Sequence, residues 1–237
     1  PLRSPPMQHR GKAAKAGQQM LLRSLTGALV LAAIAAAAGQ VTCGPGLDSF
    51  LAVMGLWGAF AVFCVAFFRD PDSAPNPPAN AYLSPAHGMV DIIDETNEPE
   101  FIGGPCKRIS IFLSVFDVHV QKSPVAGTLS YLRHHQGEFL NALNLDSAAK
   151  NENVMLGFTP AHNPQEKIGV RLIAGLIARR ILPWSKTGDT IAHGERISLI
   201  QFGSRVTLYL PLDAKVQVQL KQRVQGGITV LATRPIP

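Results

Sequence analysis

The sequence predicts a mostly β protein of the α+β class, with two N-terminal transmembrane helices followed by a β-rich domain. Two uncharged, apolar runs of 19 and 20 residues, at 24–42 and 49–68, stand near the N-terminus. After residue 82 the chain changes to short runs rich in Val, Ile and Leu, separated by Gly, Pro and polar residues. Short apolar runs bounded by turn residues are typical of strands.

The length of 237 residues accommodates a membrane anchor and one domain of roughly 150 to 170 residues. We divide the chain into a basic, flexible tail (1–23), a transmembrane helical hairpin (24–68), a linker (69–81) and a single β-rich domain (82–237). The linker is assigned because four prolines stand between residues 70 and 80.

The two apolar runs are each long enough to cross a bilayer. At about 1.5 Å per residue, each helix reaches roughly 30 Å, the thickness of the hydrocarbon core. A cleaved signal peptide is the alternative for the first run, but a second run after a short turn favours a hairpin. Basic residues before the first run and Arg69 after the second place both ends in the cytoplasm by the positive-inside rule. The net charge of +6 is then explained by an anionic membrane surface rather than by nucleic acid.

Three cysteines, Cys43, Cys64 and Cys106, form no CxxC pair, and two lie in or beside apolar segments. Such cysteines behave as small hydrophobic residues. We therefore expect a reducing compartment and no metal site.

Within the domain, alternation predicts strands at 106–114 and 214–220, and a further strand is expected at 154–158. By periodicity alone the segment 167–181 could be an amphipathic helix, but Gly169, Gly175 and its β-branched residues favour two strands. Residues 224–232 are expected to form a turn and a closing strand. The acidic segment 94–100 and the polar stretch around His134 and His135 are expected to be loops. Arg179 and Arg180 form either a solvated edge or a contact for lipid phosphate. The C-terminal part is similar to the flattened barrel-sandwich of lipoyl and biotinyl carrier domains.

Gly203 and Ser204 interrupt two apolar runs that are expected to be buried strands. A glycine tolerates strained dihedral angles, so the hydroxyl of the next residue can approach the glycine carbonyl and shift the peptide to an ester. A nearby base must take the hydroxyl proton. Elimination and hydrolysis would then leave a pyruvoyl group, a ketone that serves as a built-in cofactor, at the start of a new chain beginning at position 204.

The segment 202–206, Phe-Gly-Ser-Arg-Val, followed by Tyr-Leu-Pro at 209–211, resembles the processing site of the short bacterial and archaeal type of phosphatidylserine decarboxylase proenzyme. Further segments resemble the same pyruvoyl-dependent decarboxylase family in the same order. They are Phe-Phe-Arg-Asp-Pro at 67–71, Leu-Ser-Pro-Ala-His-Gly-Met-Val at 83–90, and Ser-Val-Phe-Asp-Val-His-Val at 114–120 with Ser-Pro-Val-Ala-Gly at 123–127.

The resemblance implies a lyase that converts phosphatidylserine to phosphatidylethanolamine and CO2 through a Schiff base with the pyruvoyl group at position 204, without a metal. It marks His119 as an active-site residue for decarboxylation or protonation. It also implies a zymogen that cleaves itself between Gly203 and Ser204 into two chains that stay together as a heterodimer. A bacterial inner membrane with the catalytic domain on the cytoplasmic side, anionic lipid as a partner, and a homodimer are compatible with this function; nucleic acid is not expected.

One position departs from the family's pattern: His87 stands where the family has an aspartate that orients or serves as the base for self-cleavage. A histidine can itself be a general base near neutral pH. Alternatively His87 is a turn residue and the role has moved, for example to Asp91. Two other functions remain open from the sequence: a decarboxylase relative that has lost activity, and a membrane-anchored barrel-sandwich carrier or adaptor protein.

Overall fold

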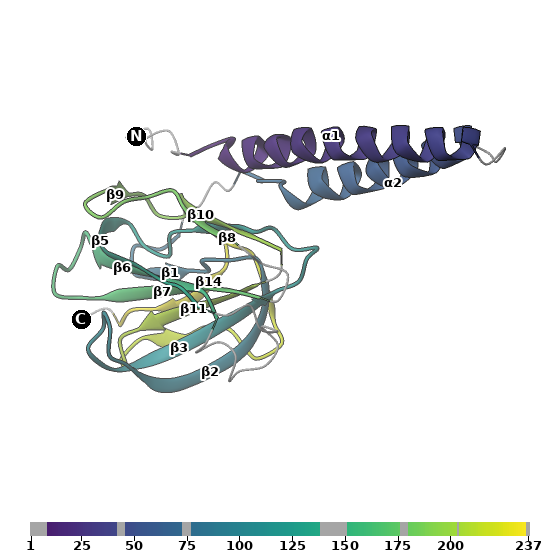
Figure 1. Cartoon of the computed structure of the whole chain (residues 1–237). Helices are drawn as coiled ribbons and strands as arrows, with labels where there is room; N and C mark the ends of the chain where they lie inside the picture. The colour runs from purple at the N-terminus through teal and green to yellow at the C-terminus, as the bar shows by residue number, and fades with distance from the viewer. Residues whose placement is uncertain are drawn as a thin grey trace. The chain divides into compact units, whose positions relative to one another are not determined.

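The computed structural model describes residues 9–41, 46–72, 77–137, 151–175, 180–202 and 204–235. It divides into a helical unit, Gly11–Asp70, and a β-rich unit that contains Pro71–Pro237. The mostly β fold class and the two preceding apolar helices are confirmed (Figure 1).

The helical unit is an antiparallel hairpin of α1 (Lys12–Val41) and α2 (Gly46–Phe67). Trp57 Nε1 donates to Ser24 Oγ at 3.2 Å, and Cys64 Sγ lies 3.9 Å from Met20 Sδ, so the two helices run side by side in opposite directions. Both helices are long and apolar enough to cross a membrane. Helix α1 begins at Lys12, well before the expected start at residue 24, because Ala, Lys, Gln, Leu and Met between them are good helix formers.

The β-rich unit is built on one eight-stranded antiparallel sheet in the order β13-β2-β3-β11-β7-β6-β5-β9. Its strands are β2 (Gly88–Glu98), β3 (Gly104–Leu113), β5 (Gly127–His135), β6 (Asn153–Pro160), β7 (Ile168–Ala174), β9 (Thr190–Ile191), β11 (Ser204–Leu210) and β13 (Arg223–Val224). Two three-stranded sheets complete the domain: β4-β10-β8 and β1-β14-β12. These contain β1 (Ala81–Leu83), β4 (Val120–Lys122), β8 (Arg180–Pro183), β10 (Arg196–Gln201), β12 (Lys215–Val216) and β14 (Val230–Thr233).

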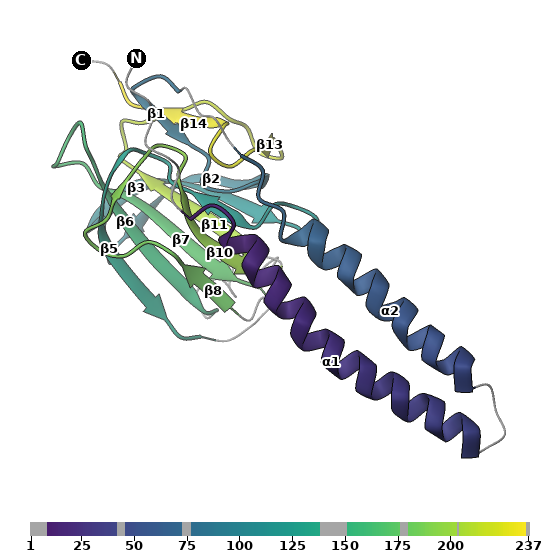
Figure 2. The same cartoon turned by 90° about the horizontal axis from the view of Figure 1, so that it is seen from above.

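Strand β11 lies in the interior of the large sheet, between β3 and β7 (Figures 1 and 2). Because successive side chains of a strand point to opposite faces, Val206, Leu208 and Leu210 point into the main apolar core. Arg205, Thr207 and Tyr209 point to the other face, where Tyr209 packs with a second cluster that includes Cys106 and Met155.

Three local predictions were wrong, and the first two fail for the same reason. The acidic segment expected to be a loop continues β2 as far as Glu98, and Arg108 on β3 donates two hydrogen bonds to Asp94 there. His134 and His135 lie in strand β5, where they contact Glu152 and Glu100 at 2.9 and 2.7 Å. Polar side chains in these strands find partners across the sheet, which a local pattern does not reveal. The strand expected at 214–220 is confined to Lys215–Val216.

Candidate active site

Ser204 begins strand β11 and is completely buried. It pairs with Leu113 of β3 on one side and with Ala174 of β7 on the other, and both neighbours are also fully buried. Within the described part of the chain, the Ser204 hydroxyl oxygen has no hydrogen-bond partner. A buried hydroxyl without a partner costs free energy, on the order of 1 to 3 kcal/mol, and native proteins rarely retain one without a reason.

The backbone two residues before Ser204 is strained. Phe202 has φ = 63°, in the left-handed region that residues with a side chain seldom occupy. Such a residue costs on the order of 1 to 3 kcal/mol and is characteristic of functional sites. Gly203, the predicted partner in cleavage, lies outside the described residues.

His119 is fully buried in the segment between β3 and β4. Its Nδ1 lies 2.9 Å from the main-chain oxygen of Asp117. A carbonyl oxygen can only accept, so Nδ1 carries the proton and Nε2 is the nitrogen that can take up or deliver one. The main-chain oxygen of His119 in turn accepts from Ile200 N at 3.2 Å and from Gln121 Nε2 at 2.7 Å.

The fold brings the segments that carry His119 and Ser204 to the same end of the sheet. Leu113 pairs with Ser204 and stands six residues before His119. Ile200, which donates to the main chain of His119, stands four residues before Ser204. The two residues are therefore connected through β3 and through β10, although they are distant in sequence.

His87 reaches the same end of the sheet from another direction. It is half-buried in the turn before β2. Met89 pairs with Phe112, and Phe112 pairs with Arg205, so the start of β2 lies two strands away from the start of β11. A Cβ added to Gly226 would lie 3.1 Å from the His87 ring, which shows how closely the turn at 225–229 covers the imidazole.

Asp91, the alternative base, lies in strand β2. Its Oδ2 forms an ion pair at 2.7 Å with Arg205 Nη2, and the Arg205 side chain is only 3% exposed. Burial raises the pKa of Asp91, and the charge of Arg205 opposes that rise. Since Arg205 and Ser204 are consecutive residues of a strand, Asp91 contacts the face of the sheet opposite to the Ser204 hydroxyl.

Comparison with known proteins decides the family. The family described as phosphatidylserine decarboxylase matches residues 60–232. Phosphatidylserine decarboxylase proenzymes of Desulfotalea psychrophila and Erythrobacter litoralis are 41% and 44% identical to this chain over 169 and 184 residues, which are 71% and 73% of this chain and 78% and 73% of the relatives. The proenzyme of Amoebophilus asiaticus is 39% identical over 195 residues, 81% of each chain.

This chain belongs to the phosphatidylserine decarboxylase family. The matched region begins inside α2, ends in β14 and contains His87, His119 and Ser204. Membership supports a decarboxylase proenzyme and gives no support to the carrier or adaptor alternative.

Sequence reasoning did not assign a role to Asp117 of this decarboxylase. Its Oδ2 accepts hydrogen bonds from the amide and the hydroxyl of Ser114, both at 2.8 Å, and its Oδ1 pairs with Arg223 Nη1 at 2.8 Å. Burial alone would raise the pKa of Asp117, but these hydrogen bonds outweigh it and hold the pKa below the ordinary value. The anchored carboxylate fixes the turn whose main chain orients His119. An Asp two residues before an expected catalytic His was the available signal.

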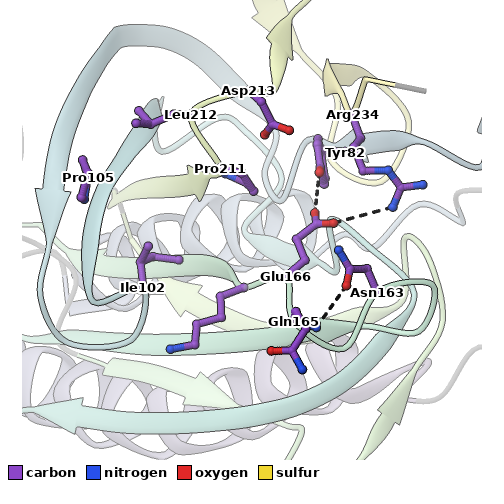
Figure 3. Close-up of a pocket in the computed structure, with 11 residues that line it drawn as sticks. Tyr82, Ile102, Pro105, Asn163, Gln165, Glu166, Pro211, Leu212, Asp213 and Arg234 are labelled. Atoms are coloured by element: carbon purple, nitrogen blue, oxygen red, sulfur yellow. Dashed lines mark hydrogen bonds and ion pairs between the residues drawn. The ribbon is translucent and has the colours of Figure 1, made fainter. Parts of the chain in front are cut away.

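A cavity of about 510 Å³ lies at the other end of β11, beside Pro211, Leu212 and Asp213. At about 3.3 Å per residue, this end of the strand is roughly 20 Å from Ser204. Figure 3 shows Tyr82 and Arg234 directed at Glu166. Burial is the main cause that raises the pKa of Glu166, although the Tyr82 hydroxyl opposes it. The Tyr82–Glu166–Arg234 contacts join β1, the 161–167 loop and the C-terminal segment, so we interpret them as structural.

Proposed function

We propose that this protein is a membrane-anchored phosphatidylserine decarboxylase that cleaves itself between Gly203 and Ser204 and uses the resulting pyruvoyl group to convert phosphatidylserine to phosphatidylethanolamine and CO2. The observation that carries the proposal is the buried Ser204 hydroxyl, which has no hydrogen-bond partner within the described part of the chain and lies two residues after Phe202, whose φ is 63°. Strain before the serine and an unsatisfied hydroxyl both raise the energy of the uncleaved chain relative to the cleaved one.

His87 is the proposed proton acceptor for self-cleavage. It lies in the turn at the same end of the sheet as Ser204, whereas the alternative, Asp91, is engaged by Arg205 on the other face. Histidine is the side chain whose ordinary pKa lies closest to neutral pH, which suits a general base.

His119 is the proposed proton donor for decarboxylation. Nδ1 is committed to the main-chain oxygen of Asp117, so the ring orientation is fixed and proton exchange takes place at Nε2. The pyruvoyl ketone would bind the amine of the lipid and accept the electron pair released with CO2. The buried surroundings of Ser204, formed by Leu113 and Ala174, exclude water from that position.

The two chains produced by cleavage, 1–203 and 204–237, are proposed to remain one folded unit. Strand β11 begins at the new terminus and is hydrogen-bonded to β3 and β7 of the larger chain along its length. Strand β14 of the smaller chain pairs with β1 of the larger. Separation would expose both ladders and the apolar core face, so the products stay associated.

We further propose a bacterial inner membrane location, with the hairpin spanning the membrane and the β-rich domain on the cytoplasmic side. Arg10, Lys12 and Lys15 precede or begin α1, and Arg69 follows α2. Basic residues at both ends of a hairpin favour the cytoplasmic side for each end.

Intact-mass analysis of the purified protein, combined with measurement of CO2 release from phosphatidylserine, tests the proposal. Wild-type protein should yield a 34-residue fragment, 204–237, with a blocked N-terminus, together with activity. Ser204→Ala should abolish both, while Ser130→Ala on β5 should preserve both. An active preparation that contains only the full-length chain, or a Ser204→Ala protein that decarboxylates, would overturn it.

A further inference from the structure

Large apolar side chains are exposed at few places in the β-rich unit. Among its described residues, five such side chains are exposed: Phe116 (76%), Leu220 (57%), Ile228 (50%), Leu212 (42%) and Met89 (38%). Leu212 lines the cavity at the far end of β11. The other four, which we call the apolar rim, belong to segments that meet at the edge formed by β2 and β13.

Main-chain pairing connects two members of the rim. Met89 of β2 pairs with Arg223 of β13 (Figure 2). Leu220 lies just before this pairing begins, where Lys221 N donates to Val90 O at 2.7 Å. Met89 and Leu220 are therefore held on neighbouring segments of one sheet edge.

The other two members are held at the same edge by contacts with it. The ion pair between Arg223 Nη1 and Asp117 Oδ1, at 2.8 Å, ties the turn that carries Phe116 to β13. Ile228 lies in the turn directly after β13, which is fixed by a hydrogen bond from Gly227 N to Ser84 O at 2.8 Å. Four exposed apolar side chains from three separate segments thus lie along one edge of the sheet.

The charges around the rim are mainly basic. Lys221 and Arg223 are exposed, and the Arg223 side chain is 71% exposed even though it pairs with Asp117. Exposed apolar groups beside basic residues are the composition of surfaces that enter the interface of anionic membranes. The same chain carries two helices that are apolar enough to cross a membrane, so a bilayer is within its reach.

Two members of the rim lie in segments that adjoin the candidate active site. Phe116 stands three residues before His119. The turn that carries Ile228 also contains Gly226, where an added Cβ would lie 3.1 Å from the His87 ring. A lipid that leaves the bilayer at the rim therefore enters the domain at the end where His87, His119 and Ser204 converge.

We propose that the apolar rim, Met89, Phe116, Leu220 and Ile228, is the surface by which the β-rich domain docks on an anionic bilayer, with its candidate active site facing the lipid. The helical hairpin tethers the domain to the membrane, and the rim sets which face of the domain meets it. The docking role rests on the proposed function only in taking a membrane lipid as the substrate.

Fluorescence quenching in vesicles tests the contact directly and does not require activity. The full-length protein with Trp57→Phe and Trp184→Phe would be reconstituted into phosphatidylserine-containing vesicles, with Phe116→Trp or Ile228→Trp as the probe. Lipids brominated on the acyl chain should quench both probes, whereas the matched control Leu212→Trp should be quenched by aqueous iodide instead. Quenching of the two rim probes by iodide alone would overturn the proposal. Protection from both quenchers would assign the rim to a protein partner such as a second copy of the chain, and would also overturn it.

Kinetics with two forms of the substrate provide the second arm. Phe116→Ser and Ile228→Ser should each raise KM for phosphatidylserine in vesicles, because they remove apolar area that enters the bilayer. This fold-increase should be on the order of ten times the fold-increase in KM for a short-chain, monomeric phosphatidylserine. Leu212→Ser should leave both KM values unchanged. Equal changes with both substrates would show a structural role and overturn docking. A wild-type protein that decarboxylates neither substrate would refute the proposed function, while the quenching result would still decide the docking surface.

Discussion

His119 Nδ1 lies 2.9 Å from the main-chain oxygen of Asp117, and this contact determines which ring nitrogen can exchange a proton. The Asp117 carboxylate is itself held by Ser114 and Arg223, so the turn that orients the imidazole is fixed at several points. The arrangement separates the structural role of Nδ1 from the chemical role of Nε2.

Replacing His119 by Asn separates these two roles. The Asn amide can still donate to the Asp117 oxygen, but it has no group that transfers a proton in place of Nε2. We expect decarboxylation to fall by about 10²- to 10⁴-fold, the usual range for loss of a general acid or base, with a small change in Tm. His134→Asn, on exposed β5, is the control and should keep its activity. Wild-type turnover in His119→Asn would remove His119 from the proton transfer.

Substitution of His87 tests the base for self-cleavage. His87→Ala should slow the appearance of the 204–237 fragment by about 10²-fold or more, because no other group at that position would take the Ser204 proton. His87→Asp, which restores the residue type found in the family's pattern, should cleave faster than His87→Ala. Time-resolved mass analysis of freshly synthesised chain gives both rates. Equal rates in wild type and His87→Ala would show that His87 is only a turn residue.

The Asp91–Arg205 pair is expected to contribute to stability rather than to cleavage. Asp91→Asn removes the negative charge next to a guanidinium that is 3% exposed, and breaking such a pair costs about 3 to 5 kcal/mol. Chemical denaturation in detergent should show this loss while the 204–237 fragment still forms. The double variant Asp91→Leu/Arg205→Met should recover much of the stability, because both charges are then removed. If Asp91→Asn folds normally and fails to cleave, Asp91 is the base.

Glu166 should make the stability of the domain depend on pH. Burial raises the pKa of Glu166 above its ordinary value of 4.5, so the native state prefers the protonated carboxyl. This contribution to stability is complete below the ordinary pKa and is lost as pH rises through the raised native pKa. Glu166→Gln is neutral throughout, so its Tm relative to wild type should increase as the pH rises above the ordinary carboxyl pKa of 4.5. Glu95→Gln, on the exposed surface of β2, should show a constant difference. A constant difference for Glu166→Gln as well would contradict the raised pKa.

Local patterns in the sequence were sufficient for several features. Within lipid, the main-chain N–H and C=O groups of a long uncharged run find hydrogen-bond partners only if the run is helical. The hairpin of α1 and α2 was therefore predictable. Alternating or β-branched runs identified β3, β6 and β7. The segments around Ser204 and His119 were recognisable because they resemble segments of the phosphatidylserine decarboxylase family in the same order along the chain.

Polar strands were not predictable in the same way. Asp94 and His135 looked like loop residues because a local window shows only their polarity. In the folded domain they lie in strands and contact Arg108 and Glu100, residues 14 and 35 positions away. A polar side chain is stable in a strand when it has a partner on a neighbouring strand, and the register of the two strands determines that partner.

The sequence by itself determined that two helices apolar enough to cross a membrane precede a β domain and that a Gly-Ser pair stands where a buried strand begins. Only the tertiary structure decided that Ser204 pairs with Leu113 and Ala174, that Asp91 contacts the face of the sheet opposite to the Ser204 hydroxyl, and that His87 and His119 come to the same end of the sheet. The physical reason is that residue types and spacing follow from the covalent chain, whereas burial and contact follow from the pairing of β11 with strands far away in sequence.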